Sequence, residues 1–170
     1  MVKCPSNLKD RMSDRTKPTI HLAADHAAYE LKEELKRYLI RAGYRVVDQG
    51  AFELSPTDDY PDFILPAAEA VAKSRGRAVA VVMGGSGIGE CIAANKVPGV
   101  RAALVYDDYT AKMSRLHNDA NVLCLGARTP SGAPAAAKKI VGTWLRTAFT
   151  GDARHRRRLK KIADYEKRAV

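Results

Sequence analysis

Four glycines stand within six residues, in the run Gly84-Gly85-Ser86-Gly87-Ile88-Gly89, and a glutamate follows at position 90. Because glycine lets a chain turn tightly, successive N–H groups of such a loop can point into one concavity, which favours an anion or a developing oxyanion. A helix beginning here would add the positive end of its dipole. The run therefore predicts a loop that binds a negatively charged group.

Two familiar glycine loops do not fit this run. No Gly-Lys-Ser/Thr ends it, so it is not a Walker loop, and Glu90 stands where the dinucleotide fingerprint needs its third glycine. A tight turn that only packs a helix on a strand is the plainer interpretation. Four glycines exceed what such a turn requires, so we favour the binding loop.

Glu90 allows two interpretations. A carboxylate in the first turn of a helix often only complements the helix dipole. In a dry pocket its pKa would instead rise toward neutrality, which makes a usable general base. The residue pattern alone leaves both open.

Two further groups carry acid–base side chains. Asp25-His26 follows the first predicted strand, where Asp25 is either a helix N-cap or a functional carboxylate. His117-Asn118-Asp119 closes a predicted helix, where a histidine often only offsets the dipole. Its place before a strand makes His117 the weaker candidate, unless a neighbouring subunit's site lies there.

The C-terminal segment is basic. Arg154 and Arg158 are four residues apart, hence on one helix face, and two guanidinium groups on one face can clamp a phosphate. A solvated charge run is the alternative. Leu159 and Ile162 are expected to dock this helix on the domain.

Strands and helices alternate along the chain. Short apolar runs predict strands at 19–24, 45–48, 78–83, 100–106 and 122–126, and apolar spacings of three or four predict helices between them. In the helix after the fourth strand, Tyr109, Met113 and Leu116 are expected to face inward. This alternation predicts an α/β fold of three layers, with a five-stranded parallel, Rossmann-like doubly wound sheet. Ligands of such sheets bind outside the carboxyl ends of the strands.

Length and composition fit one domain. We expect residues 1–18 to be a disordered extension and 19–170 to be the single domain. Of the net charge of +10, residues 1–19 and 151–170 carry +8, so a nucleic-acid partner is not expected. No apolar run approaches the length of a membrane span. Three cysteines without a CxxC pair argue against a disulfide framework and suit a cytoplasmic location.

Several segments together resemble the type B ribose-5-phosphate isomerases, the family that includes galactose-6-phosphate isomerase. The resemblance runs from about residue 19 to 165 and rests on Ala24-Asp25-His26-Ala27, Asp59-Tyr60-Pro61, the run 84–101, the run 114–121, Gly126-Ala127-Arg128 and Arg154-His155. It implies isomerisation of an aldose phosphate through an enediolate without metal or cofactor. It also implies a strand order of 2-1-3-5-4 and a homodimer whose subunits share their sites. One branch of the family has its base cysteine at the position of Gly84; this chain resembles the glutamate branch.

The resemblance also implies a role for each residue. Glu90 would move the proton between C2 and C1, and His117 would open the sugar ring. Asp25 would transfer the proton of a substrate hydroxyl. The Ser86 hydroxyl would help the N–H groups of the loop to hold the enediolate oxygen. Substrate contacts are expected from Asp25, His26, Tyr60, Gly85, Ser86, Gly87, Ile88, Gly89, Asn118 and Arg128, and phosphate contacts from Arg154 and Arg158.

Ribose 5-phosphate is the expected substrate. A tetrose phosphate or galactose 6-phosphate would use the same catalytic set, because pocket length, shaped by residues 50–59, decides between them. A non-enzymatic nucleotide-binding module would explain the glycine loop but not Glu90. Whether dimers pair into tetramers stays open.

Overall fold

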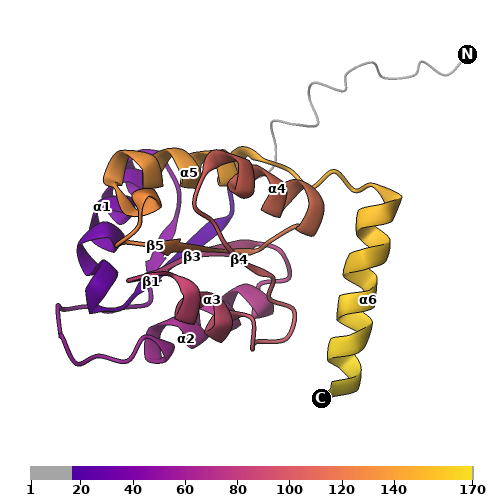
Figure 1. The fold of residues 1–170 in the computed structure, drawn as a ribbon, viewed down its shortest axis with the longest axis horizontal. Helices are drawn as coiled ribbons and strands as arrows, with labels where there is room; N and C mark the ends of the chain where they lie inside the picture. The colour runs from indigo at the N-terminus through magenta and orange to yellow at the C-terminus, as the bar shows by residue number, and fades with distance from the viewer. Residues whose placement is uncertain (1–16, 170) are drawn as a thin grey trace, which may run out of the picture.

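The computed structural model describes residues 17–169 and consists of three layers, with a parallel sheet between two layers of helices (Figure 1). The strands are β1 (Thr19–Ala24), β2 (Val46–Asp48), β3 (Ala78–Gly84), β4 (Ala102–Leu104) and β5 (Val122–Gly126), in the order β2-β1-β3-β5-β4. All four pairings are parallel. The predicted fold class and strand order are confirmed.

The helices divide between the two faces of the sheet. On one face lie α1 (Tyr29–Arg41), α4 (Asp108–Asn118) and α5 (Pro134–Arg146), and on the other α2 (Pro61–Lys73) and α3 (Ile88–Ala94) (Figure 1). Two short 3₁₀ turns, His26–Ala28 and Pro130–Gly132, precede α1 and α5. The described part of the chain ends with α6 (Ala153–Ala169).

Alternation along the central strand explains the two layers. Val81 and Met83 of β3 belong to the apolar cluster under α1 and α5, whereas Ala80 and Val82 belong to the cluster under α2 and α3. Successive side chains of a strand point to opposite faces, so a continuous apolar run is buried on both sides. This burial fixes β3, and therefore the loop that follows it, at the centre of the sheet.

The fourth strand is shorter than predicted because its ends bond elsewhere. The Arg101 N–H donates to Asn121 Oδ1 (2.8 Å), and the Tyr106 N–H donates to Thr110 Oγ1 (3.3 Å). The prediction that Tyr109 faces inward is wrong, since it is 69% exposed. Ala111 and Ser114 are the buried residues of α4.

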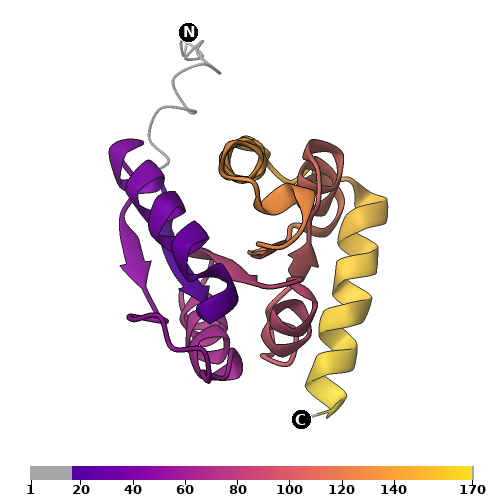
Figure 2. The ribbon, with the colours of Figure 1, turned by 60° about the vertical axis from the view of Figure 1, so that its left-hand side comes forward.

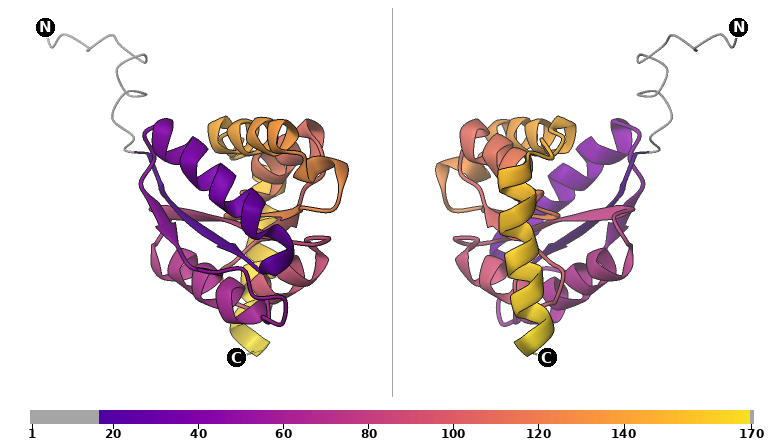
Figure 3. Two further views of the ribbon diagram at one scale, coloured as in Figure 1. Left: turned by 90° about the vertical axis from the view of Figure 1, so that its left-hand side faces the viewer. Right: turned by 90° about the vertical axis from the view of Figure 1, so that its right-hand side faces the viewer.

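Helix α6 stands at one side of the molecule and runs from the α4–α5 layer past the sheet to the α2–α3 layer (Figures 2 and 3). Its expected apolar stripe docks only in part, since Leu159 is half-buried. Ile162 is 51% exposed, and His155 is the buried side chain near the start of the helix. The helix contacts the domain near both ends, where His155 is buried and Glu166 Oε2 accepts from the Gly99 N–H (3.2 Å), and Ile162 between them stays exposed.

At the other end of the chain, most of the predicted 1–18 extension lies outside the described residues. Lys17 is described, and its Nζ donates to Ala42 O (2.6 Å). Within residues 17–169, no helix is both long and apolar enough to cross a membrane.

Candidate active site

The glycine loop lies at the carboxyl end of β3 and leads into α3. Gly87 is the N-cap of α3 with φ +78°, a conformation that favours glycine. The Ser86 hydroxyl accepts a hydrogen bond from the Ile88 N–H (3.2 Å). The neighbouring strand end fixes the loop, because the Ala127 N–H donates to Gly84 O (2.8 Å) and the Arg128 N–H to Gly85 O (2.9 Å). The loop is therefore held rigidly at the edge where ligands of such sheets bind.

Glu90 lies in the first turn of α3 and is only 4% exposed. Its carboxyl group occupies the space over the Cα of Gly84, where any Cβ would overlap Glu90 Oε1. Burial raises the pKa of the Glu90 carboxyl, a hydrogen bond from its own N–H partly offsets this, and the Asp25 carboxylate raises the pKa further. The side chain thus has the environment of a general base beside an anion-binding loop.

Asp25 and His26 follow β1 at the same edge. Asp25 is the N-cap of the first 3₁₀ turn, with its Oδ1 accepting from the Ala27 N–H (3.0 Å), so the capping interpretation is confirmed. Its carboxyl is buried and close enough to act on Glu90. His26 bonds to Asp58, with 2.6 Å between His26 Nδ1 and Asp58 Oδ1.

Tyr60 and Arg128 lie on either side of the loop. A Cβ on Gly89 would come within 2.9 Å of the Tyr60 ring, and a Cβ on Gly85 within 3.6 Å of Arg128 Nη1. Residues from three other segments therefore lie around the loop 84–89 and Glu90. They are Asp25 with His26, Tyr60, and Arg128.

The remaining predicted residues form a second group. His117 and Asn118 end α4, and the His117 ring stacks on that of His155, with 4.4 Å between centroids and 11° between planes. Arg154 Nε donates to His155 Nε2 (3.2 Å), so Arg154 lies beside the stacked pair. Arg158 is exposed one turn further along α6.

The two groups lie at opposite ends of the sheet within one chain. His117 and Asn118 precede β5, whereas Arg128 follows it. With about 3.3 Å per strand residue, the five residues of β5 separate its ends by about 15 Å. One chain therefore does not bring His117, Asn118, Arg154 or Arg158 to Glu90.

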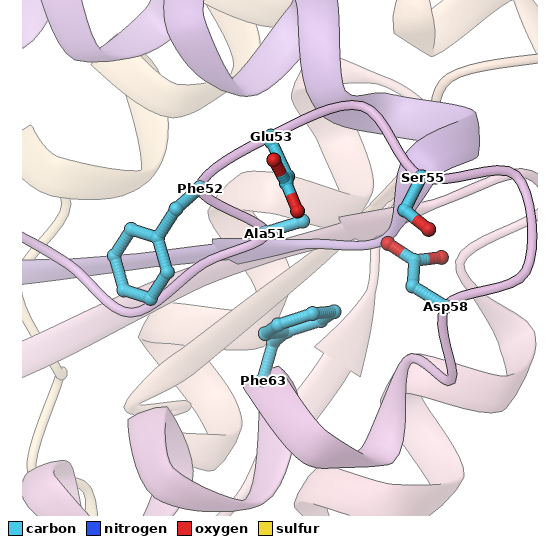
Figure 4. A pocket seen from close by; sticks show the side chains of 6 residues that line it. All are labelled: Ala51, Phe52, Glu53, Ser55, Asp58 and Phe63. Atoms are coloured by element: carbon cyan, nitrogen blue, oxygen red, sulfur yellow. The ribbon is translucent and has the colours of Figure 1, made fainter.

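Asp58 is the residue of this edge that the sequence analysis missed. Three acidic residues in the loop 50–59 were visible, but nothing in their spacing links Asp58 to a histidine 32 residues earlier. Asp58 also lines a cavity of about 290 Å³ with Ala51, Phe52, Glu53, Ser55 and Phe63 (Figure 4). The cavity lies beside the first group, because the backbone of Ala51 bonds to that of Ala24 at the end of β1.

Known proteins are similar to this chain in sequence and in fold. A family model described as Ribose/Galactose Isomerase matches residues 20–162. Ribose-5-phosphate isomerase B of Mycobacterium tuberculosis is 41% identical over 148 residues, which is 87% of this chain and 90% of that protein.

Solved structures agree with this assignment. The isomerase B of Mycoplasma genitalium, described with bound ribulose-5-phosphate, is 40% identical with a TM-score of 0.85, over 90% of this chain and 99% of that one. The Clostridium thermocellum enzyme is 45% identical with a TM-score of 0.83, over 89% of this chain and 99% of that one. This chain therefore belongs to the ribose/galactose isomerase family, as its resemblance to the type B ribose-5-phosphate isomerases indicated.

Proposed function

We propose that this protein interconverts ribose 5-phosphate and ribulose 5-phosphate through an enediolate. The observation that carries the proposal is the position of Glu90, a buried carboxyl with a raised pKa that is packed against the first glycine of an anion-binding loop. The similarity to ribose-5-phosphate isomerases along nearly the whole domain supports the same substrate.

In the proposed reaction Glu90 takes the proton from C2 of the open-chain aldose and returns it to C1. The carbonyl oxygen at C1 becomes negatively charged as C2 loses its proton, and a second proton transfer between the oxygens completes the isomerisation. N–H groups of Gly85, Ser86, Gly87 and Gly89 stabilise that charge, and removing one such donor typically costs about 10²–10³ in turnover. Asp25, next to Glu90, handles the hydroxyl proton.

The second group of residues completes the site from another copy of the chain. His117 would open the furanose ring, Asn118 would bind the sugar, and Arg154 with Arg158 would hold the phosphate. Since one chain separates these side chains from Glu90 by the length of the sheet, a homodimer must supply them. Symmetric dimers are the commonest assemblies, and each would then contain two shared sites.

An exposed apolar surface beside the glycine loop supports this assembly. Ile88 and Ile92 stand one turn apart on α3 and are 54% and 58% exposed, and Leu104 of the adjacent edge strand is partly exposed. A Cβ on Gly87 would come within 2.8 Å of Leu104, so this surface is continuous with the loop. We call Ile88, Ile92 and Leu104 the α3 surface and assign it to the second copy.

Mixing two inactive variants tests the base and the shared site together. Glu90→Gln and His117→Asn should each lower kcat by at least about 100-fold, because each removes one proton-transfer group. When the two are unfolded together and refolded in equal amounts, half of the dimers contain one intact site. The mixture should therefore recover about a quarter of the wild-type activity, as expected for a two-fold symmetric dimer.

The controls of that experiment use the same assay. Refolding either variant alone should recover nothing, and a Glu90→Gln variant with near-normal turnover would reject Glu90 as the base. A mixture that stays inactive would reject the sharing of sites between subunits. Assays with four-, five- and six-carbon aldose phosphates should show the fastest ketose formation with ribose 5-phosphate.

A further inference from the structure

All the hydrogen bonds of the Asp58 carboxyl within the described chain go to one residue. Asp58 Oδ1 accepts from the backbone N–H of His26 (3.1 Å) and lies 2.6 Å from its Nδ1. Asp58 Oδ2 is buried without a hydrogen-bond partner among residues 17–169. The side chain of Asp58 is only 8% exposed, while that of His26 is 32% exposed. A buried carboxyl thus depends on the N–H groups of His26, and the His26 ring remains open to a ligand.

The geometry favours a proton on Nδ1 of the His26 ring. Oδ1 already accepts from the backbone N–H of His26, so this oxygen acts as an acceptor. An unprotonated Nδ1 at 2.6 Å would oppose its lone pair to that negative oxygen, whereas a protonated Nδ1 donates a short, charge-assisted bond. Which nitrogen of a histidine is protonated is set by the bond that the other nitrogen makes.

The surroundings keep this carboxylate in place. The Asp58 N–H donates to Ser55 O (3.2 Å), so Asp58 ends a tight turn just before α2 begins. Figure 4 shows the Asp58 carboxyl beside Ser55 at one end of the cavity, with the Phe63 ring below it. Apolar lining from Ala51, Phe52 and Phe63 limits competition from water for the carboxylate.

We propose that Asp58 is a positioning residue that holds Nδ1 of His26 protonated and thereby makes Nε2 the nitrogen presented to the phosphorylated sugar. The proposal rests on the proposed function for the identity of that ligand, but its structural part does not. Free imidazole side chains in water favour the opposite tautomer, with the proton on Nε2. Without Asp58, Nε2 of His26 would carry the proton in much of the population. It could then no longer accept a hydrogen bond from the substrate, and substrate binding would weaken.

Nuclear magnetic resonance tests the tautomer without substrate. The chain has four histidines, so long-range ¹H–¹⁵N spectra of its ring nitrogens are simple to assign, with His26→Ala identifying the His26 signals. In mildly alkaline buffer the wild type should show a protonated Nδ1 at His26. In Asp58→Ala and Asp58→Asn the proton should move toward Nε2. An unprotonated Nδ1 in the wild type, or spectra that both variants leave unchanged, would overturn the proposal.

Kinetics tests the consequence for binding. Asp58→Ala should raise KM for ribose 5-phosphate about tenfold with a much smaller change in kcat, since a lost hydrogen bond from a positioned group weakens binding by about that factor. In a His26→Ala background the same substitution should change KM little, because the two residues act as one unit. Glu69→Ala removes an exposed charge from α2, away from this cavity, and should leave KM unchanged. An equal effect of Asp58→Ala in both backgrounds would show that Asp58 acts on the fold rather than through His26.

The two tests separate the two proposals. A wild-type protein without isomerase activity but with a protonated Nδ1 would reject the proposed function and keep the assignment of Asp58. Normal isomerase activity with an unprotonated Nδ1 at His26 would keep the proposed function and reject the assignment of Asp58.

Discussion

At the residue scale, Gly84 and Glu90 occupy each other's space. The Glu90 carboxyl lies where a side chain on residue 84 would stand, so the missing side chain of Gly84 is what lets the glutamate fold back over the loop. A cysteine at this position, which the resemblance implies for the other branch of the family, would leave no room for such a glutamate. A side chain at position 84 and the buried Glu90 carboxyl therefore exclude each other, because they would occupy the same space.

Replacing Gly84 by alanine should displace the Glu90 carboxyl. A misplacement of about 1 Å can cost about 10²-fold in rate, so we expect kcat to fall by about that factor. Overpacking should also lower the free energy of unfolding by about 1–3 kcal/mol. Steady-state kinetics and urea unfolding measure the two effects.

Gly142→Ala is the matched control. There a Cβ would meet only the ends of two long side chains, Arg146 Nη1 at 3.0 Å and the Tyr38 hydroxyl at 3.4 Å, so activity should stay near normal. A Gly84→Ala enzyme with unchanged kcat would contradict this prediction, because it would show that the Glu90 carboxyl does not need the position over Gly84.

At the element scale, a buried lysine ties α1 to the end of β2. Lys32 is fully buried, and its Nζ donates to both oxygens of Asp48 (2.8 Å each). Asp48 Oδ1 also accepts from the Gly50 N–H (3.0 Å), just where the loop that carries Asp58 begins. The ion pair therefore helps to set the position of the segment that reaches His26.

Lys32→Met should destabilise the fold by about 3 kcal/mol at neutral pH, because it leaves a half-buried carboxylate with Lys36 as its remaining cation. Burial alone would raise the pKa of Asp48, but hydrogen bonds from Lys32 and Lys36 outweigh it and lower the pKa below its ordinary 3.8. The stabilisation is therefore present above pH 3.8 and lost as the pH falls through the lowered pKa. Urea unfolding should therefore show that the difference in free energy of unfolding between wild type and variant shrinks as the pH falls below 3.8.

Lys73→Met provides the comparison. Lys73 pairs with Glu69 on the exposed face of α2, and such surface pairs contribute at most about 1 kcal/mol. Equal losses in the two variants would show that burial adds nothing to the Lys32 pair.

The same elements show what could be predicted from sequence. The apolar run of β3 and the glycine loop after it predicted the position of Glu90, because strand periodicity and turn chemistry are local properties. The bond between His26 and Asp58 could not be predicted, since it depends on how a 32-residue connection closes. Burial of Ile162 was predicted wrongly, because an apolar stripe shows that a helix can dock but not where its partner surface lies.

At the scale of the whole molecule, one chain holds two incomplete sets of residues. Glu90, the glycine loop and Asp25 lie at the carboxyl ends of the strands, while His117 and Arg154 lie at the amino ends. In the proposed reaction, neither set alone supplies the groups that open the sugar ring, hold the phosphate and move the proton. The α3 surface adjoins the first set, so covering it with a second copy would also enclose the site and exclude water.

Ile92→Glu should prevent this assembly. A glutamate at the centre of the α3 surface would have to be buried unpaired in the dimer, which costs several kcal/mol, whereas in the monomer Ile92 is exposed and the substitution leaves the core intact. Sedimentation velocity at micromolar concentration should show a monomer, circular dichroism should show an unchanged fold, and kcat should fall by about 100-fold or more because no complete site forms. Ile40→Glu changes an equally exposed isoleucine on α1, remote from α3, and should leave both assembly and activity as they are. If Ile92→Glu became monomeric and kept its turnover, one chain would have to contain a complete site, and His117 and Arg154 would have no part in it.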